Sequence, residues 1–421
     1  MRNWACIAGL SLAMMVAVPA SAAQAPVWAG SWASGQQIPE PANSLSADSL
    51  TDATLRELIH LSIGGGPIRV RVSNVFGTAP LTLTSVHAAI ALAPGTAKIG
   101  VDSDHALTFS GRESVTIPAG ADVVSDPADF LMPAGGNLAI SLYFTAAPAQ
   151  QTSHPGARTT SFLVHGNHVA DPDLTAPQTF EHWFNLSGVD VAVPQPVSAV
   201  VIMGDSITDG RGSTPNGNNR WPDMLATRLS ALPAGQRHGV LNVGIGGNRV
   251  LLDSLGPSAS ARFIRDVLAQ TDARYLLVLE GINDIGTLDP AAAADAHTAL
   301  VEHVEQAYAQ MIARAREHGV MAIGATILPF AGSDYYNKDP RREADRQAIN
   351  AWIRTPGNFD AVVDFDVVTR DPAKPDALKA EYDSGDHLHP SAAGYAAMGA
   401  AVPLDLFADK TVKAVRKKRR S

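Results

Sequence analysis

The first half of the chain shows the alternation of hydrophobic and polar residues that is typical of antiparallel strands. Short β-branched runs separated by turn residues cover 68–75, 81–87, 114–117 and 138–144. A period of two places successive side chains on opposite faces of a sheet, so these strands should be half-buried. We therefore expect residues 26–193 to form an antiparallel β-sandwich with a jelly-roll-like architecture.

One segment of this half has a helical pattern. Residues 51–62 read T-D-A-T-L-R-E-L-I-H-L-S, and Thr51 or Asp52 could cap a helix there. The same residues could run into a strand, so the pattern leaves both structures open. The sequence V-P-Q-P at 193–196 then interrupts the pattern and indicates the end of a domain.

After this break, strands alternate with helices. Patterns of buried strands lie at 197–203, 239–243, 274–280, 320–327 and 359–365. Helical patterns lie near 220–232, 258–270, 291–318, 340–354 and 391–407. The alternation predicts an α/β domain over 197–408, with a doubly wound parallel sheet in three layers. In such a sheet the ligand site lies beyond the carboxyl ends of the strands, near the point where the strand order reverses.

Composition and charge narrow the class of protein. The 421 residues are 46% hydrophobic and 17% charged, which is typical of a globular protein and excludes a disordered chain. The net charge is −9, although seven of the last twelve residues, in a basic tail at 409–421, are Lys or Arg. The rest of the chain is therefore acidic, and a nucleic-acid partner is not expected. A single cysteine, Cys6, excludes a disulfide within the chain.

Residues 1–22 have the pattern of a secretory signal peptide. Arg2 precedes an apolar run, and Ala20-Ser21-Ala22 fits the small-x-small pattern that signal peptidase accepts. The apolar run is shorter than the roughly 20 residues that span a bilayer, which argues against a retained anchor. We expect cleavage near Ala22 and a secreted or periplasmic protein without stable membrane insertion.

Residues that can carry chemistry follow the first two predicted strands of the α/β domain. Ser206 of Gly204-Asp205-Ser206 lies at a tight turn near a helix start, where developing negative charge is favoured. On its own the tripeptide could equally be a helix cap. After the second strand, Gly246 or Gly247 could offer a backbone N–H to an oxyanion, or only form a turn. The G-x-G-G spacing there does not fit a dinucleotide-binding motif.

Two further groups follow the later strands. Asn283 supplies a neutral amide donor after the third strand, unless it or Asp284 only caps the next helix. After the fifth strand, Asp386 and His389 are three residues apart and would share one side of a helical turn. A histidine oriented by a carboxylate can take the proton of a serine at neutral pH.

That last segment leaves two alternatives open. The pair formed by Asp383 and His387 is four residues apart, and spacing does not exclude it. Two carboxylates and two histidines within seven positions could also bind a metal ion, although no second ligand cluster supports this. The conjunction of a serine, a glycine N–H, an amide and a His/Asp pair favours acyl transfer through a covalent intermediate. We expect no metal and no cofactor.

At these residues the sequence resembles the GDSL, or SGNH, hydrolase superfamily. Gly204-Asp205-Ser206 matches the first block, Gly247 fits the second best, and the G-x-N-D block is found at 281–284. The D-x-x-H block is found at 386–389. The whole layout is similar to a secreted bacterial subfamily in which a β-sandwich precedes the hydrolase domain.

The resemblance implies a role for each matched residue. Ser206 would be the nucleophile and the first oxyanion donor, with Gly247 and Asn283 as the other donors. His389 would be the base and Asp386 would orient it.

The implied function is that of a secreted serine esterase. We expect short, acetyl-type acyl groups on a small molecule or a polysaccharide, with the loop at 331–339 helping to set the substrate. The alternatives are a lipase or arylesterase for longer or aryl esters, an acyltransferase that uses the same triad, and a carbohydrate-binding protein without activity.

Overall fold

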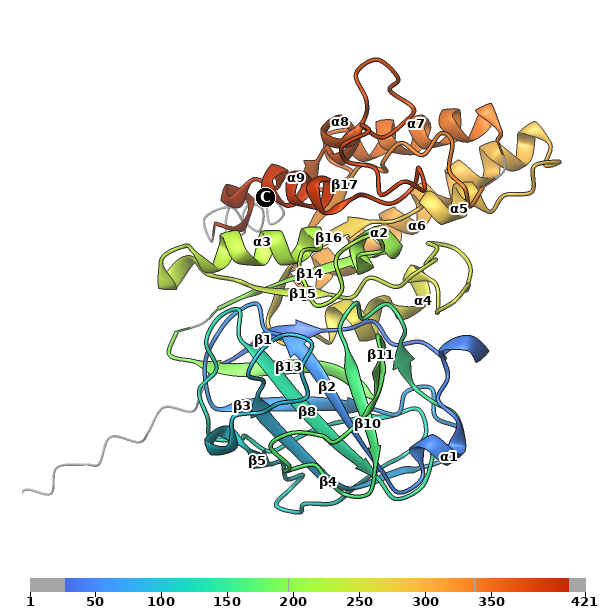
Figure 1. Cartoon of the computed structure of the whole chain (residues 1–421). Helices are drawn as coiled ribbons and strands as arrows, with labels where there is room; N and C mark the ends of the chain where they lie inside the picture. The colour runs from blue at the N-terminus through green and yellow to red at the C-terminus, as the bar shows by residue number, and fades with distance from the viewer. Residues whose placement is uncertain (1–26, 196, 337, 409–421) are drawn as a thin grey trace, which may run out of the picture.

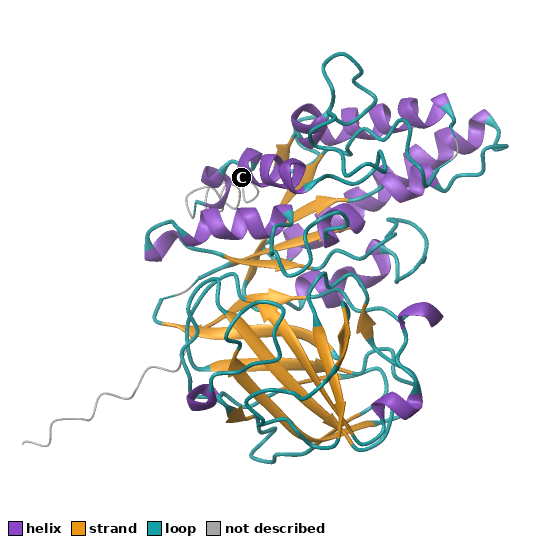
Figure 2. Ribbon diagram, in the orientation of Figure 1, coloured by secondary structure: helices purple, strands orange, loops and turns teal. Residues whose placement is uncertain are grey.

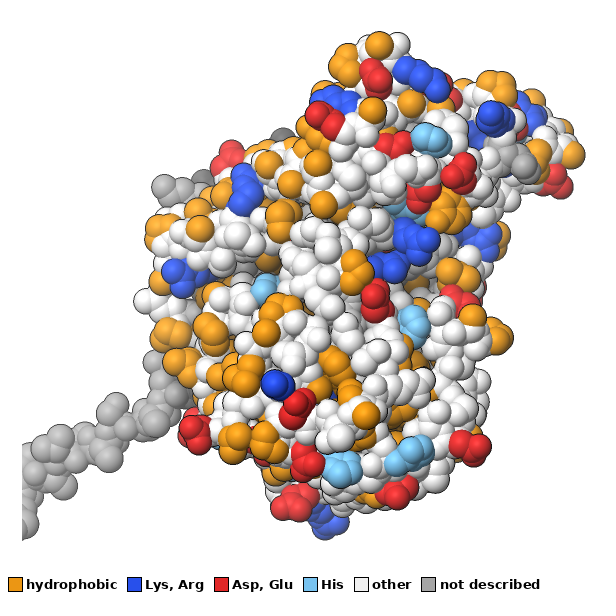
Figure 3. All heavy atoms as spheres, viewed as in Figure 1, with side chains coloured by type: hydrophobic (Ala, Val, Ile, Leu, Met, Phe, Trp, Pro, Cys, Tyr) orange, Lys and Arg blue, Asp and Glu red, His pale blue; other side chains and the backbone are white. Residues whose placement is uncertain are grey.

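The computed structural model describes residues 27–195, 197–336 and 338–408, which form two domains packed against each other (Figure 1). Strands build the first domain, whereas strands alternate with helices in the second (Figure 2). The predicted signal peptide, Cys6 and the basic tail at 409–421 lie outside the described residues. No helix in the described ranges is long and apolar enough to cross a membrane. On the face shown in Figure 3, acidic, basic and hydrophobic side chains are interspersed over both domains.

The first domain consists of antiparallel sheets that enclose one apolar core. One sheet has the order β1-β13-β3-β7, the other β11-β10-β2-β8-β4-β5 with β6 beside β4, and β9 pairs with β12. The strands are β1 (Val27–Ala33), β2 (Ala53–His60), β3 (Ile68–Ser73), β4 (Leu81–Ile90), β5 (His105–Ala106), β6 (Val115–Ile117), β7 (Asp122–Val124), β8 (Asn137–Phe144), β9 (Ser153–His154), β10 (Ser161–His165), β11 (Gln178–Phe180), β12 (Trp183–Phe184) and β13 (Leu186–Val193). A short helix, α1 (Ala47–Leu50), precedes β2. The expected antiparallel, sandwich-like domain is confirmed.

The structure decides between the helix and the strand that the pattern of residues 51–62 left open. This segment forms the strand β2 and not a helix, and β2 is buried along almost its whole length. Arg56 lies on β2 with no exposed surface, and its guanidinium donates to the carbonyl groups of Ala97, Val169 and Asp171. A second apolar cluster, which includes Leu58 of β2, also covers the outer face of this sheet. Arg56, whose place in the sequence resembles the polar face of a helix, therefore forms its hydrogen bonds beneath surface loops. The central strands of this sheet are more than half-buried, in contrast to the expectation.

The second domain has the predicted doubly wound parallel sheet. Its strand order is β15-β14-β16-β17-β18, so the order reverses beside β14, with β15 on one side and β16 on the other. The strands are β14 (Ala199–Gly204), β15 (Gly239–Asn242), β16 (Ala273–Leu279), β17 (Met321–Ala325) and β18 (Ala361–Val363). Every residue of β14 is buried, as expected for a strand that helices cover on both faces.

Helices pack on both faces of this sheet (Figure 2). They are α2 (Ser206–Asp209), α3 (Trp221–Ser230), α4 (Ala259–Phe263), α5 (Ile282–Gly286), α6 (Ala294–Glu317), α7 (Pro340–Arg354), α8 (Phe365–Thr369) and α9 (Ala392–Ala401). The helix expected over 258–270 is α4 followed by a π-helical turn at Ile264–Leu268. The helix expected over 391–407 is α9 followed by a separate 3₁₀ turn at Leu404–Phe407.

A buried pair joins the first domain to the end of α2. His154 Nε2 lies 2.9 Å from Asp209 Oδ1, and His154 Nδ1 lies 2.7 Å from the carbonyl oxygen of Gly35. A carbonyl can only accept, so Nδ1 carries a hydrogen, and the imidazole and the carboxyl must share a further proton between them. Both side chains are about 95% buried, which makes the pair costly to break from one side.

We predict that His154→Ala lowers the free energy of unfolding by about 3–5 kcal/mol, because it leaves the Asp209 carboxylate buried without its partner. Urea unfolding followed by circular dichroism measures this change. His165→Ala, at the exposed end of β10, is the matched control and should change stability by less than about 0.5 kcal/mol. Equal stabilities of the two variants would show that the pair does not hold the domains together.

Candidate active site

Ser206 is presented at the carboxyl end of β14. It is the first residue of α2, and Asp205 is the N-cap, whose Oδ1 accepts from the Ile207 N–H at 2.9 Å. The interpretation of Ser206 as the helix cap is therefore wrong. The turn requires Gly204, since a Cβ there would lie 2.1 Å from Thr208 Oγ1 and 2.8 Å from the Leu279 carbonyl oxygen.

Two consecutive hydrogen bonds connect Ser206, His389 and Asp386. Ser206 Oγ lies 2.8 Å from His389 Nε2, and His389 Nδ1 lies 2.6 Å from Asp386 Oδ2. The His389 side chain is almost completely buried, whereas Asp386 is partly exposed. Burial opposes ionisation of Asp386, but hydrogen bonds from the side chain and the N–H of His389 outweigh it and hold the pKa of this carboxyl well below its usual range. Asp386 therefore remains a charged acceptor beside the imidazole.

The alternative pair also forms, but on the outside of the same loop. His387 Nδ1 lies 2.5 Å from Asp383 Oδ2, and about half of the His387 side chain is exposed. The expected helical turn at 386–389 is absent, and His387 has a left-handed backbone with φ of 58°. The two histidines therefore point in different directions, and His389 is the one that contacts Ser206.

The four side chains of this loop form two separate pairs. Among the described residues, no group of three or more His, Cys, Asp or Glu is placed so that it could hold a metal ion.

Three hydrogen-bond donors are available near Ser206. In the described part of the chain, the backbone N–H groups of Ser206 and Gly247 donate to no protein acceptor. Asn283, at the start of α5, is 95% buried, and its Nδ2 donates to the carbonyl oxygen of Asn248 at 2.8 Å. This bond uses one of the two amide hydrogens and places the Asn283 side chain beside the turn that contains Gly247.

The turn at 245–248 contains Gly246 and Gly247, the two glycines considered as backbone N–H donors. Gly247 has a left-handed backbone with φ of 67°, and a Cβ there would lie 3.1 Å from Leu255 Cδ1. A Cβ on Gly246 would lie 3.7 Å from Asp209 Oδ2. Gly247 is thus the position whose backbone conformation favours glycine.

Neither Asn283 nor Asp284 caps the helix α5, whose N-cap is Gly281. Asp284 accepts from the backbone N–H groups of Val250 and Leu251 at 2.8 and 3.1 Å. Burial raises the pKa of Asp284 to about 6, although these two hydrogen bonds favour its charged form. Asp284 therefore fixes the chain that follows the glycine turn.

A cluster of buried charges lies beneath the site. The guanidinium of Arg262 has no exposed surface and lies 3.0 Å from Asp266 and 3.5 Å from Glu280. Burial, with the charge of Asp205 beside it, raises the pKa of Glu280 well above its usual range. Burial also raises the pKa of Asp205 to about 7. These raised pKa values favour the neutral forms of Glu280 and Asp205 near neutral pH.

Residues of the loop expected to set the substrate line a cavity of about 380 Å³, and none of Ser206, Asn283 and His389 lies in its lining. Tyr336 lines the cavity, and its hydroxyl also donates to Asn283 Oδ1. The neighbouring ring of Tyr335 meets the His389 imidazole edge-on, with the ring centroids 5.3 Å apart. Much of the remaining lining is charged, through Lys338, Asp339, Arg342, Glu343, Lys374 and Asp376.

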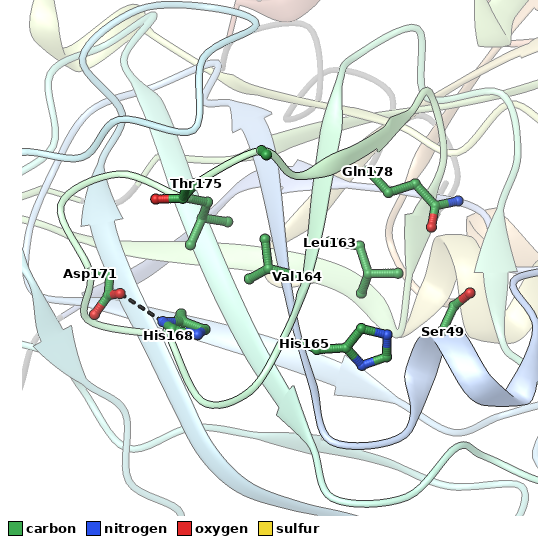
Figure 4. Close-up of a pocket in the computed structure, with 10 residues that line it drawn as sticks. Ser49, Leu163, Val164, His165, His168, Asp171, Thr175 and Gln178 are labelled. Atoms are coloured by element: carbon green, nitrogen blue, oxygen red, sulfur yellow. Dashed lines mark hydrogen bonds and ion pairs between the residues drawn. The ribbon is translucent and has the colours of Figure 1, made fainter.

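The first domain carries a separate cavity of about 420 Å³ among α1, β10 and β11 (Figure 4). His165, Gln178 and Ser49 line it, together with His168, whose Nδ1 lies 2.7 Å from Asp171 Oδ2. None of the predicted site residues lies in its lining.

Sequence reasoning missed the residues that support the site. Arg262, Glu280 and Asn248 lie outside the recognisable blocks, and their contacts join segments that are distant in the chain. Tyr336 lies in the loop expected to set the substrate, but nothing in the sequence indicated its contact with Asn283. The sequence offered one clue, which is the position of this loop. It follows the fourth predicted strand and thus lies at the same sheet edge as the other site residues.

Comparisons with known proteins support this picture of the second domain. Residues 202–397 match the model of the GDSL-like Lipase/Acylhydrolase family. A search of curated proteins gave no match.

Solved structures with similarity to this chain include two named hydrolases. A GDSL-like lipase from Bacteroides thetaiotaomicron is 21% identical, with 53% of this chain and 93% of that chain covered and a TM-score of 0.38. An acetyl xylan esterase from Geobacillus stearothermophilus is 20% identical, with 51% of this chain and 96% of that chain covered and a TM-score of 0.36.

The family match coincides with the parallel-sheet domain that holds Ser206, Asn283 and His389. The C-terminal half of the chain therefore contains a domain of the GDSL-like lipase/acylhydrolase family of ester hydrolases.

Proposed function

We propose that the protein is a secreted serine esterase that cleaves short-chain, acetyl-type carboxylic esters through a covalent acyl-enzyme. The observation that carries the proposed mechanism is the 2.8 Å contact between Ser206 Oγ and His389 Nε2, with Asp386 on the other imidazole nitrogen. A serine hydrogen-bonded to an oriented histidine is the arrangement that nucleophilic catalysis requires.

In the first half of the reaction, Ser206 Oγ attacks the ester carbonyl carbon while His389 Nε2 takes the hydroxyl proton. The carbonyl oxygen becomes an oxyanion, which the N–H groups of Ser206 and Gly247 and the Asn283 amide stabilise. Collapse of the tetrahedral intermediate breaks the bond to the alcohol oxygen, and His389 returns its proton to that oxygen. Asp386 stabilises the imidazolium that exists between these two transfers.

In the second half, water attacks the acyl-enzyme and His389 takes one of its protons. Collapse of the second tetrahedral intermediate releases the carboxylic acid and returns the proton to Ser206 Oγ. The same acyl-enzyme could pass its acyl group to a sugar hydroxyl, which is the acyltransferase alternative.

The cavity beside Tyr336 supports a small polar substrate. Half of the residues that line it are charged, and these side chains could bind polar groups of a substrate. A hydroxyl-rich alcohol, such as a sugar unit of a polysaccharide, could form hydrogen bonds with such a lining. Export through the expected signal peptide would bring the enzyme to esters outside the cytoplasm.

One observation favours the alternative of longer or aryl esters. Leu252 and Leu255 have 63% and 49% of their surface exposed, and Leu255 lies against the Gly247 turn. Exposed leucines beside a reaction centre could contact an apolar acyl or aryl group.

We predict that Ser206→Ala and His389→Ala each lower kcat for p-nitrophenyl acetate by at least about 10⁴, because both residues belong to one catalytic unit. His387→Ala is the matched control and should stay within about threefold of the unaltered enzyme, since this exposed side chain does not contact Ser206. Steady-state kinetics on folded variants measures both effects. Full activity of Ser206→Ala would reject the mechanism, and a larger loss in His387→Ala than in His389→Ala would exchange the two histidines.

The acyl-chain preference needs its own measurement. Among p-nitrophenyl esters, kcat/KM should fall by at least about tenfold between C4 and C8 acyl chains, because an overfilled site loses the near-attack geometry. Parallel assays with a sugar alcohol as acceptor would detect acyl transfer. Best cleavage of C8 to C12 esters would instead support the lipase alternative.

A further inference from the structure

The orientation of the Asn283 side chain is defined by its two partners. The carbonyl oxygen of Asn248 can only accept, so Asn283 Nδ2 must face it, at 2.8 Å. Asn283 Oδ1 consequently faces the hydroxyl of Tyr336, which must be the donor of that hydrogen bond. The second hydrogen of Nδ2 remains for a ligand.

Tyr336 is held in place from several sides. A Cβ on Gly286 would lie 2.5 Å from the ring, so the ring rests directly on the backbone of α5. The ring of Phe330 meets it edge-on at 5.9 Å, and the guanidinium of Arg342 lies 6.0 Å from its centroid. Burial, followed by the nearby charge of Asp205, raises the pKa of the Tyr336 hydroxyl, so the phenol keeps its proton and remains a donor.

We propose that Tyr336 is a positioning residue for the oxyanion hole: its hydroxyl holds the Asn283 amide in the orientation that directs one N–H to the oxyanion of the tetrahedral intermediate. This inference rests on the proposed function, because it assigns Asn283 to that oxyanion. A hydrogen bond to the amide oxygen both restricts rotation of the amide and polarises its N–H groups. Without it, Asn283 Oδ1 would be a buried acceptor without a partner, and the amide would lose its fixed orientation.

The proposal predicts a change in kcat with little change in KM. Tyr336→Phe keeps the ring that packs on Gly286 and lines the cavity, and removes only the hydroxyl. We expect kcat for p-nitrophenyl acetate to fall about 10-fold, with KM within about twofold, because the Asn283 amide acts chiefly when the oxyanion forms. Tyr382→Phe is the matched control, since the Tyr382 hydroxyl has no hydrogen-bond partner among the described residues, and its kinetics should be unchanged.

A double-mutant cycle tests whether Tyr336 acts through Asn283. Asn283→Ala should lower kcat by about 10² to 10³. In that background Tyr336→Phe should change kcat by less than about twofold, because the group that it positions is gone. Urea midpoints for all variants exclude loss of folding as the cause.

The possible outcomes are distinct. A tenfold loss for Tyr336→Phe in both backgrounds, or no loss in either, would overturn the positioning role while the esterase assignment stands. If the unaltered enzyme cleaved no ester at all, the proposed function would fail, and this proposal would fail with it.

Discussion

The buried guanidinium of Arg262 connects the ends of three neighbouring strands. It donates to the carbonyl oxygens of Gly204, at the end of β14, and Val243, just after β15, and it pairs with Glu280, just after β16. These strands bracket the point where the sheet order reverses. Because removal of one partner from a buried ion pair is costly, the guanidinium fixes the relative positions of the strand ends that carry Ser206, Gly247 and Asn283.

The same guanidinium is also connected, through Asn248, to the Asn283 amide that we propose as an oxyanion donor. The Asn248 Oδ1 accepts from Arg262 Nε and Nη2 at 3.0 and 2.7 Å, and its backbone carbonyl accepts from the Asn283 amide. The charged guanidinium of Arg262 therefore helps to orient the neutral amide of Asn283 through Asn248. Burial raises the pKa values of Asp205 and Glu280, which limits the negative charge near the position where the oxyanion would form.

Sequence reasoning predicted the parallel sheet of the second domain correctly. Ser206 and Asn283 directly follow β14 and β16, adjacent in the sheet, so their proximity follows from the parallel topology. It could not choose between the pairs of 383–389 by spacing, because the segment is a loop in which a left-handed residue at 387 turns one histidine outward. It could not decide between a helix and a strand for 51–62, because Arg56 donates to carbonyl groups of distant loops, which no local pattern reveals.

Each domain holds one end of the short helix α2, which begins with Ser206. Asp205, preceding Ser206, caps α2 from within the α/β domain, whereas Asp209, its last residue, is paired with His154 of the β domain. The backbone of this segment receives a further contact, since Arg220 Nε donates to the Asp209 carbonyl oxygen at 2.8 Å while the same guanidinium donates to the carbonyl of Ala157. A four-residue helix has too few internal hydrogen bonds to be stable alone, so its geometry depends on such external partners. The β domain is therefore part of the framework that places Ser206 beside His389.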